Sequence, residues 1–181
     1  PSTPWVGFSY ARDFNMGLLM FEHILAFESA RSAAVGIETL RSADAPAYSV
    51  TEVASDGRFF NAIAFFPQVT WHVLNRPDHK LHLRFGALFA WPAAKGGLVD
   101  PVMTMRAFDG ADIADDAVNF HGGKPGSYYG TELDLQVSWT WAGVFAWTVE
   151  GAVLFPGSSL QDRHGDAVPS FFIENRFEFL F

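Results

Sequence analysis

Charged side chains in this sequence recur at every second position within segments that are otherwise apolar. Near the C-terminus, Glu174, Arg176 and Glu178 alternate with phenylalanines, and Glu132 and Asp134 show the same spacing further upstream. Residues two apart lie on the same side of an extended strand, so each series places its charges on one face. Such a face can create a carboxylate-rich field that attracts cations, or it can form a ladder of ion pairs that fills the space.

The candidate functional residues are therefore the charged side chains on the polar faces of the expected strands. Because carboxylates are costly in an apolar environment, water or counter-charges must solvate them, and we predict that this face borders the lumen of a closed structure. Arg176 is two residues from both Glu174 and Glu178, which favours the ladder over the cation-attracting field. The predicted lumen-facing residues are Glu22, Arg84, Glu132, Asp134, Glu150, Glu174, Arg176 and Glu178.

No spacing in the chain is typical of a catalytic centre. The sequence lacks a nucleophile elbow, a phosphate-binding loop and a dinucleotide motif. His72, His79 and His82 gather around one turn without the spacing of metal ligands, and the acidic residues 109–116 do not follow the EF-hand order. We therefore expect no catalytic residue, no metal site, no cofactor and no enzymatic activity.

The elements that must position these charges are β-strands. A helix would repeat its apolar residues at intervals of three and four, whereas the alternation here has a period of two. The clearest example is residues 129–141, where large apolar side chains alternate with Glu132, Asp134, Gln136, Ser138 and Thr140. Seven segments carry this pattern, at residues 5–13, 17–29, 59–73, 81–91, 129–141, 145–155 and 170–181.

Composition narrows the class of protein further. The chain has 181 residues, of which 49% are hydrophobic and only 18% charged. No apolar run approaches the roughly 18 residues that a membrane helix needs, but strands of about 9 to 11 residues suffice to cross a bilayer. The net charge of −8 argues against a nucleic-acid partner. Cysteine is absent, so disulfide and thiolate chemistry are excluded.

The expected connections alternate strictly between short and long. Membrane barrels have short periplasmic turns and longer extracellular loops, so this succession predicts an all-β, transmembrane, antiparallel up-and-down β-barrel. We assign residues 1–181 to a single such domain, in the outer membrane of a Gram-negative bacterium. Short turns are expected around Asn15, 75–78 and 142–143, and long links at 30–58, 92–127 and 156–169.

Aromatic residues gather near both ends of the expected strands, as they do in the two interfacial girdles of a membrane barrel. One group is Trp71, Trp139, Trp141, Phe145, Trp147, Phe179 and Phe181, and the other is Trp5, Phe27, Phe59, Phe60, Trp91, Tyr128, Tyr129, Phe155 and Phe171. If Phe181 is periplasmic, seven strands place the start of the first strand outside, whereas single-chain barrels have an even number. We therefore expect the C-terminal portion of a longer barrel, or a barrel completed by another chain.

A family resemblance covers the C-terminal part of the sequence. Residues 130–135, the following aromatic strand, a short turn, a second strand and residues 154–157 resemble the C-terminal hairpin of alginate-export-like outer-membrane proteins. With the terminal phenylalanine, the resemblance extends over residues 128–181. It implies a large monomeric barrel that conducts an anionic polysaccharide or a smaller solute. That family uses basic lumen residues, whereas the polar faces here are richer in acids.

These observations predict a porin-like outer-membrane channel for passive diffusion or export of small or polysaccharide solutes. Its expected partners are outer-membrane lipid and lipopolysaccharide, with other envelope subunits as a further class and nucleic acid excluded. Two alternatives stay open: a structural or adhesive barrel within an envelope assembly, and a soluble lipocalin-like binding barrel. A detergent requirement separates the soluble barrel from the others, and single-channel conductance separates the channel from the structural barrel.

Overall fold

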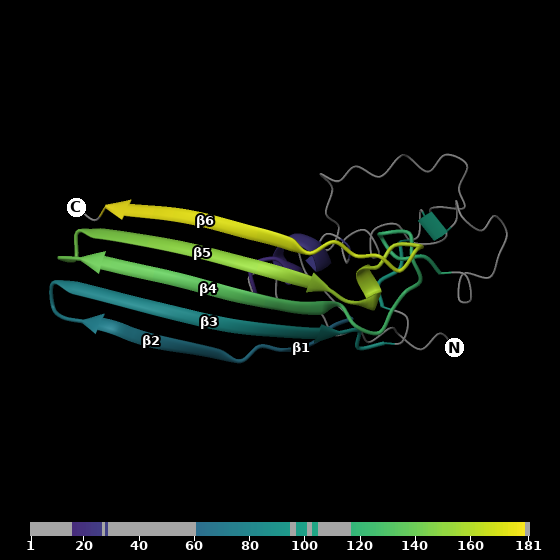
Figure 1. Cartoon of the computed structure of the whole chain (residues 1–181), viewed down its shortest axis with the longest axis horizontal. Coiled ribbons are helices and arrows are strands. Elements are labelled where there is room, and N and C mark those ends of the chain that lie inside the picture. Colours follow the sequence, from purple (N-terminus) through teal and green to yellow (C-terminus); the bar gives the residue numbers. More distant parts are fainter. Residues whose placement is uncertain are drawn as a thin grey trace, which may run out of the picture.

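One antiparallel sheet of six strands dominates the fold. The computed structural model describes residues 16–26, 28, 61–94, 97–100, 103–104 and 117–179. Two short helical elements accompany the sheet, a π-helix η1 (Met20–Leu25) and a 3₁₀ turn η2 (Ser158–Leu160). The strands are β1 (Ile63–Phe65), β2 (Gln68–Asn75), β3 (His79–Trp91), β4 (Gly130–Trp141), β5 (Phe145–Pro156) and β6 (Ser170–Phe179), drawn in Figure 1.

Strand order follows the sequence, so each long strand pairs with its neighbour in the chain. The order is β1, β3, β4, β5, β6, and β2 also pairs with β3, beside β1 on the same edge. β3 pairs with β4 from His79↔Trp141 to Ala90↔Gly130, and β5 pairs with β6 from Phe145↔Phe179 to Leu154↔Ser170. The sheet is not closed into a barrel, and its edge strands have no further strand partner within the described ranges.

The two ends of the sheet differ in their connections. Three residues join β2 to β3 and three join β4 to β5, and both turns lie at the end where β6 finishes (Figure 1). Ala142 and Gly143 in the second turn have positive φ angles of 50° and 71°, as tight hairpin turns require. We call this the turn end. The described parts of the long connections, at residues 92–94, 97–100, 103–104, 117–129 and 157–169, lie at the opposite end, which we call the loop end.

Most of the predicted strands are confirmed. β3, β4, β5 and β6 coincide with the segments expected at 81–91, 129–141, 145–155 and 170–181. The segment expected at 59–73 is divided into β1 and β2, because Phe66 and Pro67 interrupt it. Proline lacks an N–H group for the ladder, but the carbonyl of Pro67 accepts a hydrogen bond from Ala87 N at 3.1 Å. Residues 5–13 lie outside the described residues.

The strand predicted at residues 17–29 is wrong, because η1 occupies Met20–Leu25. The alternation noted at Leu19, Phe21 and Leu25 also contains the helical spacing of four, and apolar Met20 adds a second buried position. The backbone N–H groups at the start of η1 find a carboxylate partner instead of a neighbouring strand. The described part of the chain has no helix that is long and apolar enough to span a bilayer.

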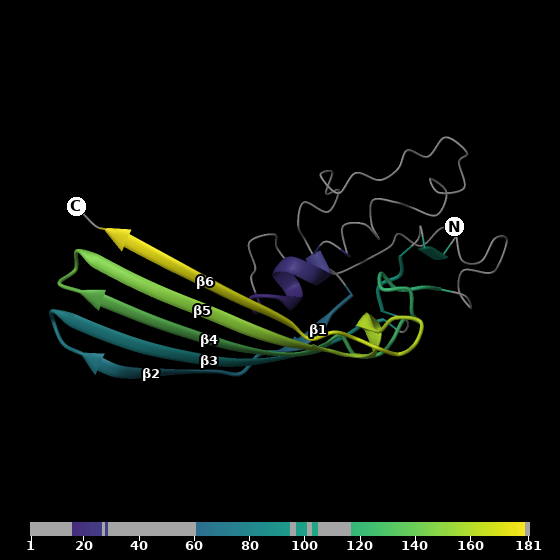
Figure 2. The same ribbon diagram turned by 45° about the horizontal axis from the view of Figure 1, so that its top comes forward.

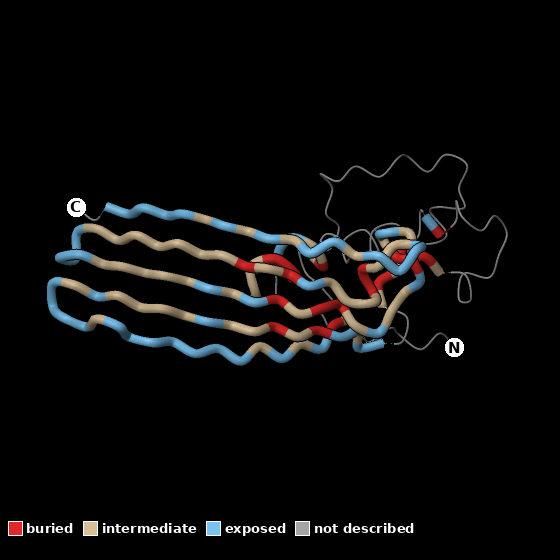
Figure 3. The backbone as a smooth tube through the Cα atoms, in the orientation of Figure 1, coloured by how far each residue is buried: buried red, intermediate tan, exposed pale blue. Residues whose placement is uncertain are grey.

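The sheet has two contrasting faces. η1 lies on one of them, near the loop end (Figure 2), and we call it the polar face. The core lies there: Met20, Phe21 and Leu25 belong to one buried cluster with the strand residues Leu88 and Leu154. The other face, which we call the apolar face, carries large exposed side chains. Burial is accordingly confined to the loop end, as Figure 3 shows.

Candidate functional site on the polar face of the sheet

The strand register places the predicted charged residues of β3 to β6 on the polar face together. Arg84 is the register partner of Gln136, which pairs with Glu150, which pairs in turn with Glu174. On the same face, Asp134 lies opposite Gly86, Glu132 opposite Leu88, Arg176 opposite Thr148 and Glu178 opposite Ala146. Glu22 differs, because it lies in η1 and is exposed, so its predicted place on a strand is wrong.

Glu132 is the most deeply placed member of this set. Its side chain has no solvent exposure, and its carboxylate accepts hydrogen bonds from three successive backbone N–H groups. Oε1 accepts from Leu18 N at 2.5 Å and Leu19 N at 2.8 Å, and Oε2 accepts from Met20 N at 2.6 Å. Hydrogen bonds to a charged acceptor are stronger than neutral ones, and they compensate for the burial of the charge. Glu132 therefore anchors the start of η1 to β4.

Gly17 makes this close approach feasible. It has a φ of +73°, a conformation that favours glycine, and an added Cβ would lie 2.8 Å from both Glu132 Oε1 and Leu88 Cδ2. Immediately after it, apolar side chains of η1 pack against the sheet residues Leu88 and Leu154. The segment is thus held by both a buried carboxylate and a hydrophobic contact.

Two arginines of the predicted set form ion pairs on the polar face. Arg84 Nη2 lies 3.6 Å from Glu150 Oε1, which also accepts a hydrogen bond from Gln136 Nε2. Arg176 Nη2 lies 3.1 Å from Glu174 Oε1, and both side chains of this second pair are exposed. Pairs of this kind are the contacts that an interior ladder requires.

A cavity of about 270 Å³ lies between the segment just before η1 and the middle of the polar face. Gly17 and Leu18 border one side, and Arg84, Asp134 and Glu150 border the other. Asp134 Oδ1 is buried without a hydrogen-bond partner in the described part of the chain. The cavity thus combines an arginine with two carboxylates, a lining that suits water and small polar solutes.

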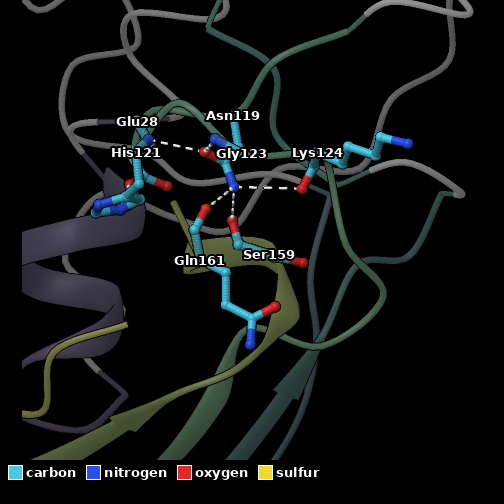
Figure 4. A network of polar contacts seen from close by, with 7 residues as sticks. All are labelled: Glu28, Asn119, His121, Gly123, Lys124, Ser159 and Gln161. Carbon is cyan, nitrogen blue, oxygen red and sulfur yellow. Dashed lines mark hydrogen bonds and ion pairs between the residues drawn. The ribbon is translucent and has the colours of Figure 1, made fainter. Parts of the chain in front are cut away.

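Asn119 joins the two long connections at the loop end (Figure 4). Its side chain is buried, and Nδ2 donates to the carbonyl oxygens of Gln161 at 2.8 Å, Ser159 at 3.1 Å and Lys124 at 3.3 Å. Its Oδ1 accepts from Gly123 N at 2.9 Å and from the backbone N of His121. The amide therefore fixes residues 119–124 against residues 159–161.

His121 connects this network to Glu28, the residue that follows η1 by three positions. His121 Nε2 lies 3.1 Å from Glu28 Oε1, and Glu28 is 8% exposed. The hydrogen bond to Glu28 is the main reason that the pKa of His121 is raised; burial opposes it, and the charge of Glu28 adds to it. The segment after η1 and the loop 117–129 are thus coupled through a titratable pair.

Sequence reasoning missed the structural roles of Asn119 and Gly17. An isolated asparagine in a polar loop has no distinctive pattern, but the glycines near it carry a usable signal. A Cβ at Gly123 would lie 2.3 Å from Gln161 O, and one at Gly126 would lie 2.3 Å from the carbonyl carbon of Ser158. Such glycines permit the close approach of two chain segments, which Asn119 then joins.

The chain has no match in three comparisons, a scan against protein-family models, a search of curated proteins and a search of solved structures.

Proposed function

We propose that this chain forms part of the wall of a porin-like outer-membrane β-barrel channel for passive diffusion or export of small or polysaccharide solutes. The observation that carries the proposal is the division of one sheet into an exposed apolar face and a polar face with a buried, hydrogen-bonded carboxylate. Lipid and lipopolysaccharide would cover the first face. The second would border the lumen of a Gram-negative outer-membrane barrel.

The apolar face supports a membrane environment. Phe65 and Trp71 on one edge of the sheet and Ile173, Phe177 and Phe179 on the other are each more than half exposed. Between them, Phe85, Leu133 and Leu135 on the inner strands β3 and β4 are each more than 40% exposed. Burying one such side chain stabilises a protein by about 1.5–3 kcal/mol, so a water-soluble protein rarely leaves a continuous apolar surface of this kind uncovered. Hydrocarbon tails would cover all of these side chains without any additional polypeptide.

Aromatic side chains also lie at the levels expected of two interfacial girdles. At the turn end, the Trp147 and Phe177 rings are stacked with centroids 6.4 Å apart, and Phe145 lies 5.3 Å from Phe179. At the loop end, the Trp91 and Tyr128 centroids are 5.5 Å apart. Such rings favour the headgroup level of a bilayer. Tyr129, expected in the same girdle, is buried instead, and its hydroxyl donates to Asn61 O at 3.0 Å.

The polar face would give the channel its selectivity. η1 lies on this face and would narrow the lumen near the loop end, which the proposal assigns to the extracellular side. Below η1, solutes would meet the lining that contains Asp134 and the Arg84–Glu150 pair. Because the acids are only partly matched by arginines, this lining favours cations over anions.

Conductance across a planar lipid bilayer tests the proposal. The full chain, refolded in detergent and added to the bilayer, is expected to produce discrete conductance steps with a preference for cations. Glu150→Gln should reduce that preference because it leaves the charge of Arg84 unmatched, whereas Glu178→Gln, at the turn end of the same face, is the matched control and should change it less. The absence of steps in protein that has inserted into lipid vesicles would overturn the channel.

A structural or adhesive barrel is the second candidate. η1 packs closely on the polar face, and Asn119 joins the long connections above it, so the interior would be filled at the loop end. This candidate predicts stable insertion into vesicles together with no conductance. The same bilayer experiment therefore separates the two functions.

A further inference from the structure

Two histidines face each other across β2 and β3 on the polar face, towards the turn end. His72 and His82 are direct register partners, and their ring centroids lie 4.4 Å apart at an interplanar angle of 77°. His72 is exposed, so solutes can reach its ring. His82 Nε2 is buried and has no hydrogen-bond partner in the part of the chain that the structure describes. A buried polar atom without a partner calls for an explanation, such as an ion that binds there.

The spacing of the rings suits one shared metal ion. Metal–nitrogen bonds to histidine are about 2.0–2.1 Å long. Two imidazoles bound to one ion at right angles then have centroids about 4.5 Å apart, and at a tetrahedral angle about 5 Å apart. The observed separation is close to the right-angled case, which is usual for tetragonal Cu²⁺ and octahedral Ni²⁺. For one ion to bind both histidines, a nitrogen of each ring must point to a common position between the rings.

We propose that His72 and His82 form a two-histidine site for a divalent transition-metal ion: Cu²⁺, Ni²⁺ or Zn²⁺. Neutral imidazole suits these ions, whereas Ca²⁺ and Mg²⁺ require oxygen ligands. Within the described ranges no group of three or more potential ligands could hold a metal, so water would supply the other coordination positions. An ion held by two protein ligands exchanges readily, which fits a binding step on a passage surface better than a structural metal.

The charged side chains around His72 and His82 affect how tightly the two histidines can bind a metal ion. Lys80 and Arg84 lie two residues to either side of His82 on the same face of β3, and both repel a metal ion. The charge of Arg84 is matched by Glu150 at 3.6 Å. Lys80 is exposed and close to the turn, so its effect is screened by solvent. Lys80→Gln should therefore tighten binding by only about twofold.

Isothermal titration of the full chain in detergent micelles with NiCl₂, ZnCl₂ and CuCl₂ tests the site. One ion per chain is expected, with the affinity order Cu²⁺ above Ni²⁺ and Zn²⁺. His72→Gln and His82→Gln should each weaken binding at least tenfold. His79→Gln is the matched control, because His79 belongs to the same hairpin but its ring stacks on Trp139, 6.3 Å away, on the apolar face.

Copper electron paramagnetic resonance of the unmodified protein provides a readout that does not depend on the folding of a variant. Hyperfine structure from two imidazole nitrogens at one equivalent of Cu²⁺ supports the site. One nitrogen or none, or equal binding by His82→Gln and the unmodified protein, would overturn it. Neither measurement requires a channel, so failure of the metal site and failure of the proposed function are distinguishable.

Discussion

Glu132 on β4 and Leu19, the residue that precedes η1, are joined by a 2.8 Å hydrogen bond between a side-chain carboxylate and a backbone N–H group, although they are 113 residues apart in sequence. The same carboxylate binds Leu18 N and Met20 N. A charge that lies inside the structure therefore holds the only π-helix of the described segments against the sheet.

Replacement of Glu132 should release η1 from the sheet. Hydrogen bonds to charged groups contribute about 1.5–3 kcal/mol each, and Glu132→Ala leaves three backbone donors, two of them buried, without their acceptor. We expect a loss of about 3 kcal/mol or more in the local free energy of opening, measured by hydrogen exchange at the amides of residues 18–20. Glu174→Ala is the control: its ion pair with Arg176 is exposed, and its loss should cost less than about 1 kcal/mol. Equal protection of these amides in both variants would contradict the anchor.

Gly17→Ala tests the close approach between η1 and Glu132. The substitution forces a positive φ on alanine and also places a Cβ 2.8 Å from Glu132 Oε1, so we expect destabilisation of about 2–3 kcal/mol. Gly143→Ala is a matched control with nearly the same φ, +71°, and open space around the added atom. It should show only the backbone strain, about 1 kcal/mol. Thermal unfolding of both variants compares the two effects, and equal losses would rule out the steric contribution.

Asn119→Asp should loosen the connection between the two long loops. The change preserves an acceptor but replaces the Nδ2 donor with an oxygen that faces the carbonyl groups of Ser159 and Gln161. We expect a loss of about 2–3 kcal/mol, since buried carbonyls lose their partner and face a like charge. Limited proteolysis in detergent should show faster cleavage within residues 119–126 and 157–166. Unchanged cleavage would mean that the glycine contacts alone hold the loops.

The Glu28–His121 pair should make the loop end dependent on pH. Since Glu28 raises the pKa of His121 in the folded protein, the protonated imidazole is the stabilised form. The pair therefore contributes its full stabilisation of the folded loop end below the ordinary imidazole pKa of about 6.5. This stabilisation is lost as the pH rises through the raised pKa of His121 in the folded protein. An NMR titration of His121 should give a higher pKa than in the Glu28→Gln variant. An identical titration in both proteins would exclude the coupling.

The sequence was a good guide to the strands with strict alternation and a poor guide elsewhere. In β4, the alternation of Leu133, Asp134 and Leu135 predicted the strand and also its two faces. A two-residue repeat is typical of a strand, and it places successive side chains on opposite faces. At η1 the alternation was misleading, since Phe21 and Leu25 fit a helical spacing as well. The contacts that favour η1 are the hydrogen bonds to Glu132 and the packing on Leu88 and Leu154, all from residues far away in sequence, and no local pattern contains them.

The same limit applies to the polar face. Sequence spacing placed Arg84 and Glu150 on polar faces, but the pairing between them depends on the register of β3, β4 and β5. The His72–His82 contact likewise requires the β2–β3 register, including the irregularity that follows His72. Spacing within a strand predicts which face a residue occupies, whereas cross-strand partners follow from turn geometry and bulges.

The central claim is that the apolar face of the sheet contacts lipid and the polar face contacts water. Fluorescence quenching at neighbouring residues of β4 tests this claim most directly. The chain has no cysteine, so single cysteines at Leu133, Leu135, Gln136 and Ser138 can each carry a fluorophore. In lipid vesicles, brominated lipid should quench the labels at 133 and 135, and aqueous iodide should quench those at 136 and 138. Equal quenching of all four by iodide, in protein that stays in solution without detergent, would contradict a membrane-facing apolar surface.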